Sequence, residues 1–144
     1  MATTPEGFYT MKGYTLLSTG EITTAMEDYL EMIARSHLCH DTVRVTDLSL
    51  QLHVKASSVS KMIQQLAKAG LVSKQKYGDI SLTEKGAYLG SYLLYRHDTI
   101  HRFLCFLNHS DNELEQVEKI EHFLSEKTVR NLEAFLTELQ NKKE

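Results

Sequence analysis

Residues that interrupt helices are scarce in this 144-residue chain, which has one proline and seven glycines. Because these residues punctuate loops, their scarcity predicts a mainly helical fold. The two cysteines, Cys39 and Cys105, have no CxxC spacing; a disulfide between them is one alternative, and we favour a reduced, cytoplasmic chain. No apolar run reaches the ~18 residues of a membrane span, and residues 1–20 lack the apolar core of a signal peptide.

Charge is unevenly distributed along the chain, although the net charge is only −3. The segment 44–76 carries six basic residues and one acidic residue, whereas the segment 110–144 carries nine acidic and five basic residues. A basic segment can meet phosphates, and an acidic segment can hold cations. The pattern therefore indicates that one end of the chain can meet phosphates and the other can hold cations.

The segment 42–82 has the pattern of a winged helix-turn-helix. A first helix over about 24–37, with Thr23 or Thr24 as its cap and Glu27 in a capping box, precedes it. Within the segment we expect a helix, a turn at 53–55, a second helix over 56–69 that Gly70 ends, and strands over 71–76 and 80–82. This order predicts an N-terminal winged helix-turn-helix domain over residues 23–83, preceded by an arm of residues 1–22.

Three further helices are predicted in the second half, which we expect to be an all-helical domain over residues 84–144. They run over about 84–107, from Ser110 or Asp111 to about Leu124, and over about 126–141, with Ser125 as the last cap. We expect Gly86 and Gly90 to weaken the first turns of the long helix without breaking it.

One face of the second helix in the pair is polar and basic, as expected for a helix that enters the major groove of DNA. The hairpin that follows is also basic and can reach the neighbouring backbone or the minor groove. A polar outer face that is merely solvated is the alternative interpretation. The candidate DNA-binding residues are Ser57, Ser58, Ser60, Lys61, Gln64, Gln65, Lys74, Lys76 and Tyr77.

Ligand-type residues are spread over three of the predicted helices. Asp28 and Glu31 share a face of the first helix because they are three residues apart, and His97 lies on the long central helix. A third set, Glu118, Glu121 and His122, stands at i, i+3 and i+4, so one face of a helix would present all three. A solvated acidic face and an ordinary core histidine are the alternatives, because the sequence alone does not show that these groups converge.

Four segments, taken together and in this order, resemble the DtxR/MntR family of metal-dependent repressors. They are Met26–Glu31, Val54–Met62, Leu94–His97 and Val117–Ser125, and the resemblance covers roughly residues 23–140. It implies a winged helix followed by a helical dimerisation domain, with metal linking the first helix to the dimerisation helices. It also implies a homodimer that binds a palindromic operator in double-stranded DNA, and a regulator rather than an enzyme.

Carboxylates at two positions resemble the manganese-type branch of that family. Asp28 and Glu118 stand where the iron-type branch has methionine and cysteine, and Mn²⁺ is a hard ion that prefers carboxylate oxygen. The resemblance implies two Mn²⁺ per protomer as corepressor at manganese-uptake genes, with Fe²⁺, Zn²⁺, Cd²⁺ or Co²⁺ as substitutes, and we expect Glu118 to form one bridge. The implied ligands are Asp28, Glu31, His97, Glu118, Glu121 and His122.

The chain departs from the family pattern at several points. The arm of residues 1–22 is longer than usual, Ala56 stands where a proline is common, and Lys119 and Phe123 replace residues of the manganese-type pattern. His101, one turn after His97, is a weaker candidate ligand. We expect a structural or incidental role for the three residues His37, Cys39 and His40.

Two other functions remain open at this point. A winged-helix regulator without metal would respond to a small molecule at a dimer interface, and its DNA binding would be insensitive to EDTA. A di-metal enzyme in a helical bundle would use a Glu-x-x-His motif on two helices. That motif does not occur on two helices here, and an enzyme would leave the helix-turn-helix unexplained.

Overall fold

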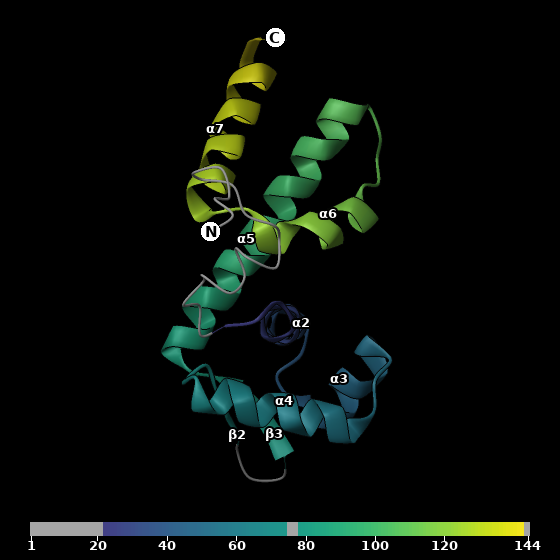
Figure 1. Cartoon of the computed structure of the whole chain (residues 1–144), viewed down its shortest axis with the longest axis vertical. Coiled ribbons are helices and arrows are strands. Elements are labelled where there is room, and N and C mark those ends of the chain that lie inside the picture. Colours follow the sequence, from purple (N-terminus) through teal and green to yellow (C-terminus); the bar gives the residue numbers. More distant parts are fainter. Residues whose placement is uncertain (1–21, 75–77, 143–144) are drawn as a thin grey trace, which may run out of the picture.

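One long helix joins two helical parts in the structure, a computed structural model that describes residues 22–74 and 78–142. Helices α2, α3 and α4 lie with a small sheet at one end of α5, and α6 and α7 pack beside its other end (Figure 1). The helices are α2 (Thr24–Cys39), α3 (Val45–Leu52), α4 (Ala56–Lys68), α5 (Glu84–Asn108), α6 (Leu114–Ile120), the 3-10 helix η2 (Glu121–Phe123) and α7 (Glu126–Lys142). The strands are β1 (Val43–Arg44), β2 (Val72–Lys74) and β3 (Asp79–Leu82). The predicted mainly helical fold is confirmed.

The helix-turn-helix and its hairpin close over a single apolar core. Leu30 of α2, Leu48 of α3 and Leu66 of α4 are completely buried in it. Burying one such side chain stabilises the fold by about 1.5–3 kcal/mol. The strands pair antiparallel in the order β1-β3-β2, with Val43 opposite Ile80, so the hairpin expected from the sequence gains a third strand from the chain before α3.

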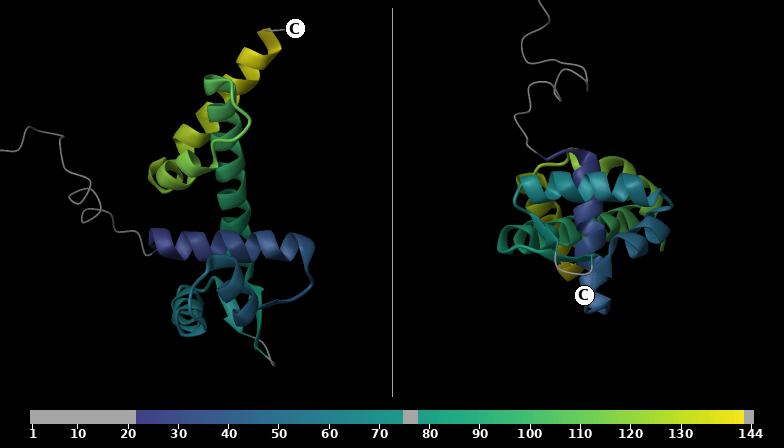
Figure 2. Two further views of the ribbon diagram at one scale, coloured as in Figure 1. Left: turned by 90° about the vertical axis from the view of Figure 1, so that its right-hand side faces the viewer. Right: turned by 90° about the horizontal axis from the view of Figure 1, so that it is seen from below.

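Two glycines of α5 mark the places where the N-terminal part approaches this helix most closely. A Cβ on Gly86 would overlap the carbonyl oxygen of Leu71, and a Cβ on Gly90 would lie 2.9 Å from the Cβ of Ala34 on α2. Helix α2 crosses α5 steeply at this level (Figure 2). These glycines therefore serve packing: Gly86 lets Leu71 lie against the first turn of α5, and Gly90 lets α2 lie against the second turn.

A second apolar core joins α5 to α6 and α7. The buried side chains in it are Ile100, Leu104, Val117 and Val129. Helix α6 ends at Ile120 and the 3-10 turn η2 follows, so the expectation of one helix reaching about Leu124 was wrong. The predicted cap of the last helix is confirmed, because the hydroxyl of Ser125 accepts a hydrogen bond from the amide of Thr128. In the described part of the chain, no helix has the length and apolar character needed to cross a membrane.

Candidate metal centre

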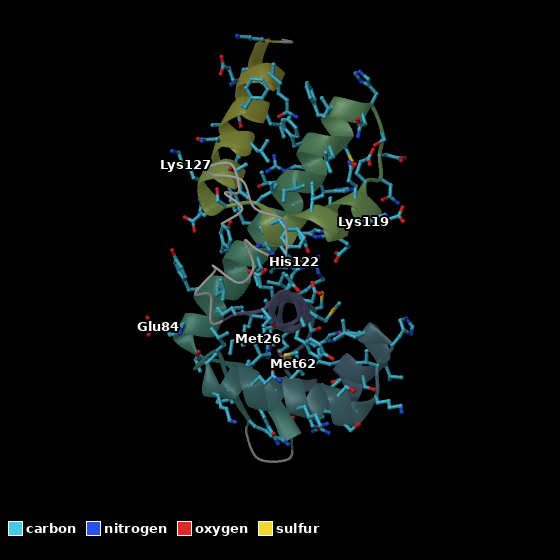
Figure 3. All side chains as sticks on the ribbon, in the orientation of Figure 1. Met26, Met62, Glu84, Lys119, His122 and Lys127 are labelled. Atoms are coloured by element: carbon cyan, nitrogen blue, oxygen red, sulfur yellow. The ribbon has the colours of Figure 1, made fainter. Side chains whose placement is uncertain are left out.

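Six ligand-type side chains from four elements meet between the two parts of the molecule. His122 lies between α2 and the helices beyond it (Figure 3). The ligand atoms form two groups, and within each group they all lie within 4.8 Å of one another. The contributors are Asp28 and Glu31 of α2, His97 of α5, Glu118 of α6, and Glu121 and His122 of η2. All six residues predicted as ligands are thus brought together.

The first group contains Glu31, His97, Glu118 and Glu121. The Nδ1 atom of His97 lies at its centre, 3.0 Å from Glu121 Oε2, 3.7 Å from Glu118 Oε1 and 3.8 Å from Glu31 Oε2. Three carboxylates and one imidazole form a donor set that suits a hard divalent cation.

The second group contains Asp28, Glu121 and His122. The Nε2 atom of His122 lies 2.9 Å from Asp28 Oδ1 and 4.0 Å from Glu121 Oε1. The two groups share Glu121, whose Oε2 lies nearest His97 of the first group and whose Oε1 lies 4.0 Å from His122 of the second. Glu118, from which we expected a bridge, belongs to the first group only.

The carboxylate of Glu121 is the strongest indication that this region binds cations. Its side chain is 0% exposed, and its Oε1 atom has no hydrogen-bond partner. Burying a carboxylate oxygen without a partner costs several kcal/mol unless a cation or a donor compensates it. A cation held between Glu121 and the ligands around it supplies this compensation, so the residues present fit a metal ion.

Burial and crowding shift the protonation of this cluster. The pKa values of Asp28, Glu31 and Glu118 lie above their usual range, chiefly because burial penalises the charged form. The neighbouring Glu121 raises all three further. The pKa of His97 is raised mainly by its hydrogen bond to Glu121. A divalent cation relieves this repulsion, and it competes with protons for the same atoms.

The break between α6 and η2 shapes how the third set of ligands is presented. We expected Glu118, Glu121 and His122 on one face of a continuous α-helix, but only Glu118 lies in α6. A 3-10 helix has about three residues per turn, which redirects the side chains that follow the junction. Glu121 thereby becomes fully buried, while Glu118 stays half-exposed at the rim.

Sequence reasoning missed the role of Glu27 and of Arg96. The cap of α2 is Thr23, whose hydroxyl accepts a hydrogen bond from the amide of Met26. Glu27 is therefore not the capping-box residue that we expected. Glu27 instead lies 2.9 Å from Nδ1 of His122 and pairs with buried Arg96. The signal available in the sequence was an arginine directly before a candidate ligand and directly after the apolar run of residues 92–95.

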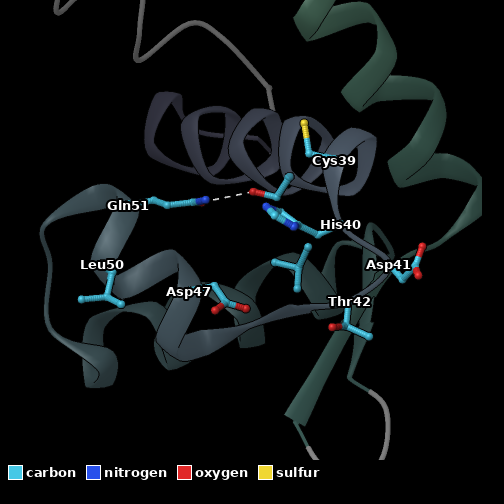
Figure 4. A pocket seen from close by; sticks show the side chains of 9 residues that line it. Cys39, His40, Asp41, Thr42, Asp47, Leu50 and Gln51 are labelled. Carbon is cyan, nitrogen blue, oxygen red and sulfur yellow. Dashed lines mark hydrogen bonds between the residues drawn. The ribbon is translucent and has the colours of Figure 1, made fainter.

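The other residues considered as ligands have different surroundings. His37 contacts the carbonyl oxygen of Ile80, and Figure 4 shows Cys39 pointing away from the ring of His40. The Nε2 atom of His101 accepts a hydrogen bond from the amide of Glu113 at the start of α6, so this ring holds the turn before that helix. In the described part of the chain, none of these side chains belongs to a group able to hold a metal ion.

The predicted DNA-binding face is exposed along α4. Ser57, Ser58, Lys61, Gln64 and Gln65 are exposed there, and Ser60 is partly buried. Its buried face, with Val59, Ile63 and Leu66, anchors the helix on the core. Lys74 is exposed at the end of β2, whereas Lys76 and Tyr77 lie outside the described residues.

The family models describe both halves of the chain. The iron dependent repressor, N-terminal DNA binding domain, matches residues 21–80, and the iron dependent repressor, metal binding and dimerisation domain, matches residues 83–144. The chain belongs to the iron-dependent repressor family. The resemblance found in the sequence is thus confirmed, and membership of this family means a DNA-binding repressor, not an enzyme.

Similar proteins include transcriptional regulators, two of them named as manganese-dependent. The HTH-type transcriptional regulator MntR of Geobacillus thermodenitrificans (strain NG80-2) is 39% identical over 104 residues, which cover 72% of this chain and 74% of that protein. The structure of the manganese regulator SloR is 32% identical with a TM-score of 0.67, covering 78% of this chain and 53% of that one. A manganese-dependent transcriptional repressor in complex with manganese is 27% identical with a TM-score of 0.71, covering 78% and 52%. This chain spans about half the length of these two solved structures.

Proposed function

We propose that this iron-dependent repressor family member is a manganese-responsive regulator of transcription, in which Mn²⁺ is the corepressor for operator binding at manganese-uptake genes. The observation that carries the proposal is the position of the two ligand groups, which join α2 to α5, α6 and η2. Helix α2 packs directly on α4, the helix that presents the DNA-binding face. The relatives named above support manganese as the ion.

We propose two Mn²⁺ ions per protomer, one at each group. Glu121 would help to hold both ions, because it is the member that the two groups share. Carboxylate oxygen with some imidazole suits Mn²⁺, although Fe²⁺, Zn²⁺, Cd²⁺ and Co²⁺ can occupy such sites with equal or higher affinity. Selectivity would then depend on which ion gives the productive arrangement of α2.

Metal binding regulates DNA binding through the junction of α2 with α5. A cation held by ligands from both sides favours one placement of the winged helix-turn-helix relative to the second half. Because the coupling between two binding sites is reciprocal, operator DNA must tighten metal binding by the same factor as metal tightens DNA binding.

The DNA partner is a palindromic operator bound by a homodimer. In such a dimer two α4 helices enter major grooves one helical turn of DNA apart, or a multiple of it. We propose residues 23–83 as the DNA-binding domain and residues 84–144 as the metal-binding and dimerisation domain. The residues proposed to contact DNA are Ser57, Ser58, Ser60, Lys61, Gln64, Gln65, Lys74, Lys76 and Tyr77.

An apolar surface between α5 and α7 suits the second protomer. Leu107 is 58% exposed and Phe135 is 51% exposed, and they line one concave surface with Phe103 and Leu139. Exposed apolar patches of this kind mark interfaces between proteins. The surface lies in the half of the chain that the dimerisation-domain model matches.

A titration of metal-free protein with Mn²⁺, with free Mn²⁺ counted by its EPR signal, tests the proposal. We expect two ions per protomer in the wild type, a reduced count in Glu118→Ala, and loss of both ions in Glu121→Gln. Glu115→Ala is the matched control, because Glu115 lies one turn before Glu118 on α6 and pairs with Lys119.

Operator binding measured with the same variants separates this function from the metal-independent one. We expect EDTA to abolish specific DNA binding by the wild type and by Glu115→Ala. DNA binding that is insensitive to EDTA, together with no Mn²⁺ uptake at micromolar concentrations, would leave a winged-helix regulator that responds to another signal.

A further inference from the structure

The two ring nitrogens of His122 face different partners. The Nε2 atom faces the ligand group, 2.9 Å from Asp28 Oδ1, and the Nδ1 atom lies 2.9 Å from Oε1 of Glu27. A histidine that binds a cation through one nitrogen commonly donates its other N–H to a carboxylate, which fixes the tautomer and the ring orientation. Glu27 occupies that position for His122, and it belongs to neither ligand group.

Arg96 holds Glu27 in place from the opposite side. Its Nη2 lies 3.3 Å from Glu27 Oε1 and its Nη1 lies 3.4 Å from Glu27 Oε2, so the guanidinium spans both carboxylate oxygens. The side chain of Arg96 is 4% exposed and its Nε atom has no hydrogen-bond partner. A buried guanidinium needs a carboxylate nearby, which gives Glu27 a fixed position and balances its charge.

Arg96 also contacts the ring of His122 directly, and this contact opposes the tautomer that Glu27 favours. The Nη2 atom of Arg96 lies 3.3 Å from Nδ1 of His122. A guanidinium can only donate hydrogen bonds, so Arg96 favours a His122 ring whose Nδ1 carries no proton. Such a neutral ring has its proton on Nε2, where it blocks the lone pair that a cation needs. Glu27, as an acceptor, favours the opposite tautomer.

We propose that Glu27, held by Arg96, is a positioning residue for the metal ligand His122. It keeps the proton on Nδ1 and thereby leaves the Nε2 lone pair for the cation, while it remains outside the ligand set itself. The inference rests on the proposed metal-dependent function, and it adds to the six ligands a pair of residues that sets how well one of them binds.

The test compares Mn²⁺ affinity among Glu27 variants, with free Mn²⁺ counted by EPR. Removing such a partner typically weakens metal binding by about 10–100-fold, and we expect this for Glu27→Ala. Glu27→Gln has the same size and keeps one acceptor oxygen, so its loss should be smaller. In the double variant Glu27→Ala/Arg96→Met, the competing donor is also absent, and we expect part of the affinity to return.

A matched control variant and an NMR signal from the His122 ring distinguish a positioning role of Glu27 from a general contribution to the stability of the fold. Glu133 of α7 also joins two helices, because it accepts a hydrogen bond from the hydroxyl of Tyr95 on α5 and pairs with Arg102. Glu133→Ala should therefore leave Mn²⁺ affinity unchanged. In protein loaded with closed-shell Cd²⁺, a proton–nitrogen NMR correlation of the ring should show a slowly exchanging proton on Nδ1 of His122. This signal should disappear in Glu27→Ala.

The outcomes separate this inference from the proposed function. Wild-type affinity and an unchanged Nδ1 proton in both Glu27 variants would overturn it while leaving the metal function intact. An equal loss of affinity in Glu133→Ala and Glu27→Ala would also overturn it, because the effect would then be general. Failure of the wild type to bind Mn²⁺ would instead reject the proposed function.

Discussion

Gly90 of α5 and Ala34 of α2 are in contact where the two helices cross, with no space for a further side chain between them. Alanine is the better helix former by about 1 kcal/mol, yet we expect Gly90→Ala to destabilise the protein, because a Cβ would lie 2.9 Å from the Cβ of Ala34. Overpacking of this kind costs about 1–3 kcal/mol. The shift of α2 should also weaken Mn²⁺ binding, since α2 carries Asp28 and Glu31.

Urea denaturation and the Mn²⁺ titration measure these two effects together. Ser91→Ala is the control, because Ser91 is exposed on the same helix and the substitution changes only helix propensity. A Gly90→Ala variant that gains stability and keeps wild-type affinity would contradict the prediction.

We predict that the metal-free protein loses stability as the pH rises. In the folded state the pKa values of Glu31 and His97 are raised, the first chiefly by burial and the second by its hydrogen bond to Glu121. The folded state therefore holds protons more tightly than the unfolded state, and this contribution to stability is lost as the pH rises from about 4 to above about 6.5. Denaturation in chelator at several pH values measures it.

Glu31→Gln provides the comparison for this pH effect. Glutamine cannot titrate, so the stability of the wild type relative to this variant should fall across the same pH range. Mn²⁺ affinity should change in the opposite direction, because the cation competes with protons and binds more tightly at higher pH. Mn²⁺ affinity that is independent of pH would contradict the role of these groups as ligands.

Metal binding should raise the melting temperature in a way that depends on Glu121. A site that is filled at 100 times its Kd stabilises the folded state by about 2.7 kcal/mol. We expect calorimetry to show a higher Tm with Mn²⁺ than with EDTA for the wild type, and no difference for Glu121→Gln. A Mn²⁺-dependent shift that survives in Glu121→Gln would place the bound ion elsewhere.

Introducing one charged side chain tests whether the apolar surface between α5 and α7 is the dimer interface. We expect Leu107→Lys to convert the dimer to a monomer in light scattering, because the exposed Leu107 side chain would be covered by the partner. Leu38→Lys is the control, because Leu38 is also exposed but lies at the end of α2. A Leu107→Lys protein that stays dimeric would exclude this surface as the interface.

Lys61 on the exposed face of α4 should contribute to DNA binding mainly through phosphate. Each such contact adds about one unit to the slope of the logarithm of affinity against the logarithm of salt concentration, so Lys61→Ala should lower the slope by about 1. Lys119→Ala, on the exposed side of α6, should leave the slope unchanged. Fluorescence anisotropy with an operator duplex at several salt concentrations measures both.

The sequence predicted the helices and the ligand types, but not how the ligands are presented. Helical spacing was sufficient to place Asp28 and Glu31 on one face of α2, because that spacing depends only on local geometry. The 3-10 turn that buries Glu121 depends on tertiary packing of η2 against α5, which local spacing does not encode. The contact of Glu27 with Arg96 joins residues that are far apart in the sequence, so neither side chain indicates it alone.

Helix α5 runs without interruption from Glu84 to Asn108. At 1.5 Å per residue this stiff rod is about 37 Å long, and its first turn is locked onto Leu71 through Gly86. His97 lies near the middle of this rod, about 20 Å from its first residue, so a rotation of about 5° about His97 would displace that end by about 1.7 Å. Because the rod is stiff, a small rotation near His97 is transmitted to the winged helix-turn-helix as a displacement of about 1–2 Å.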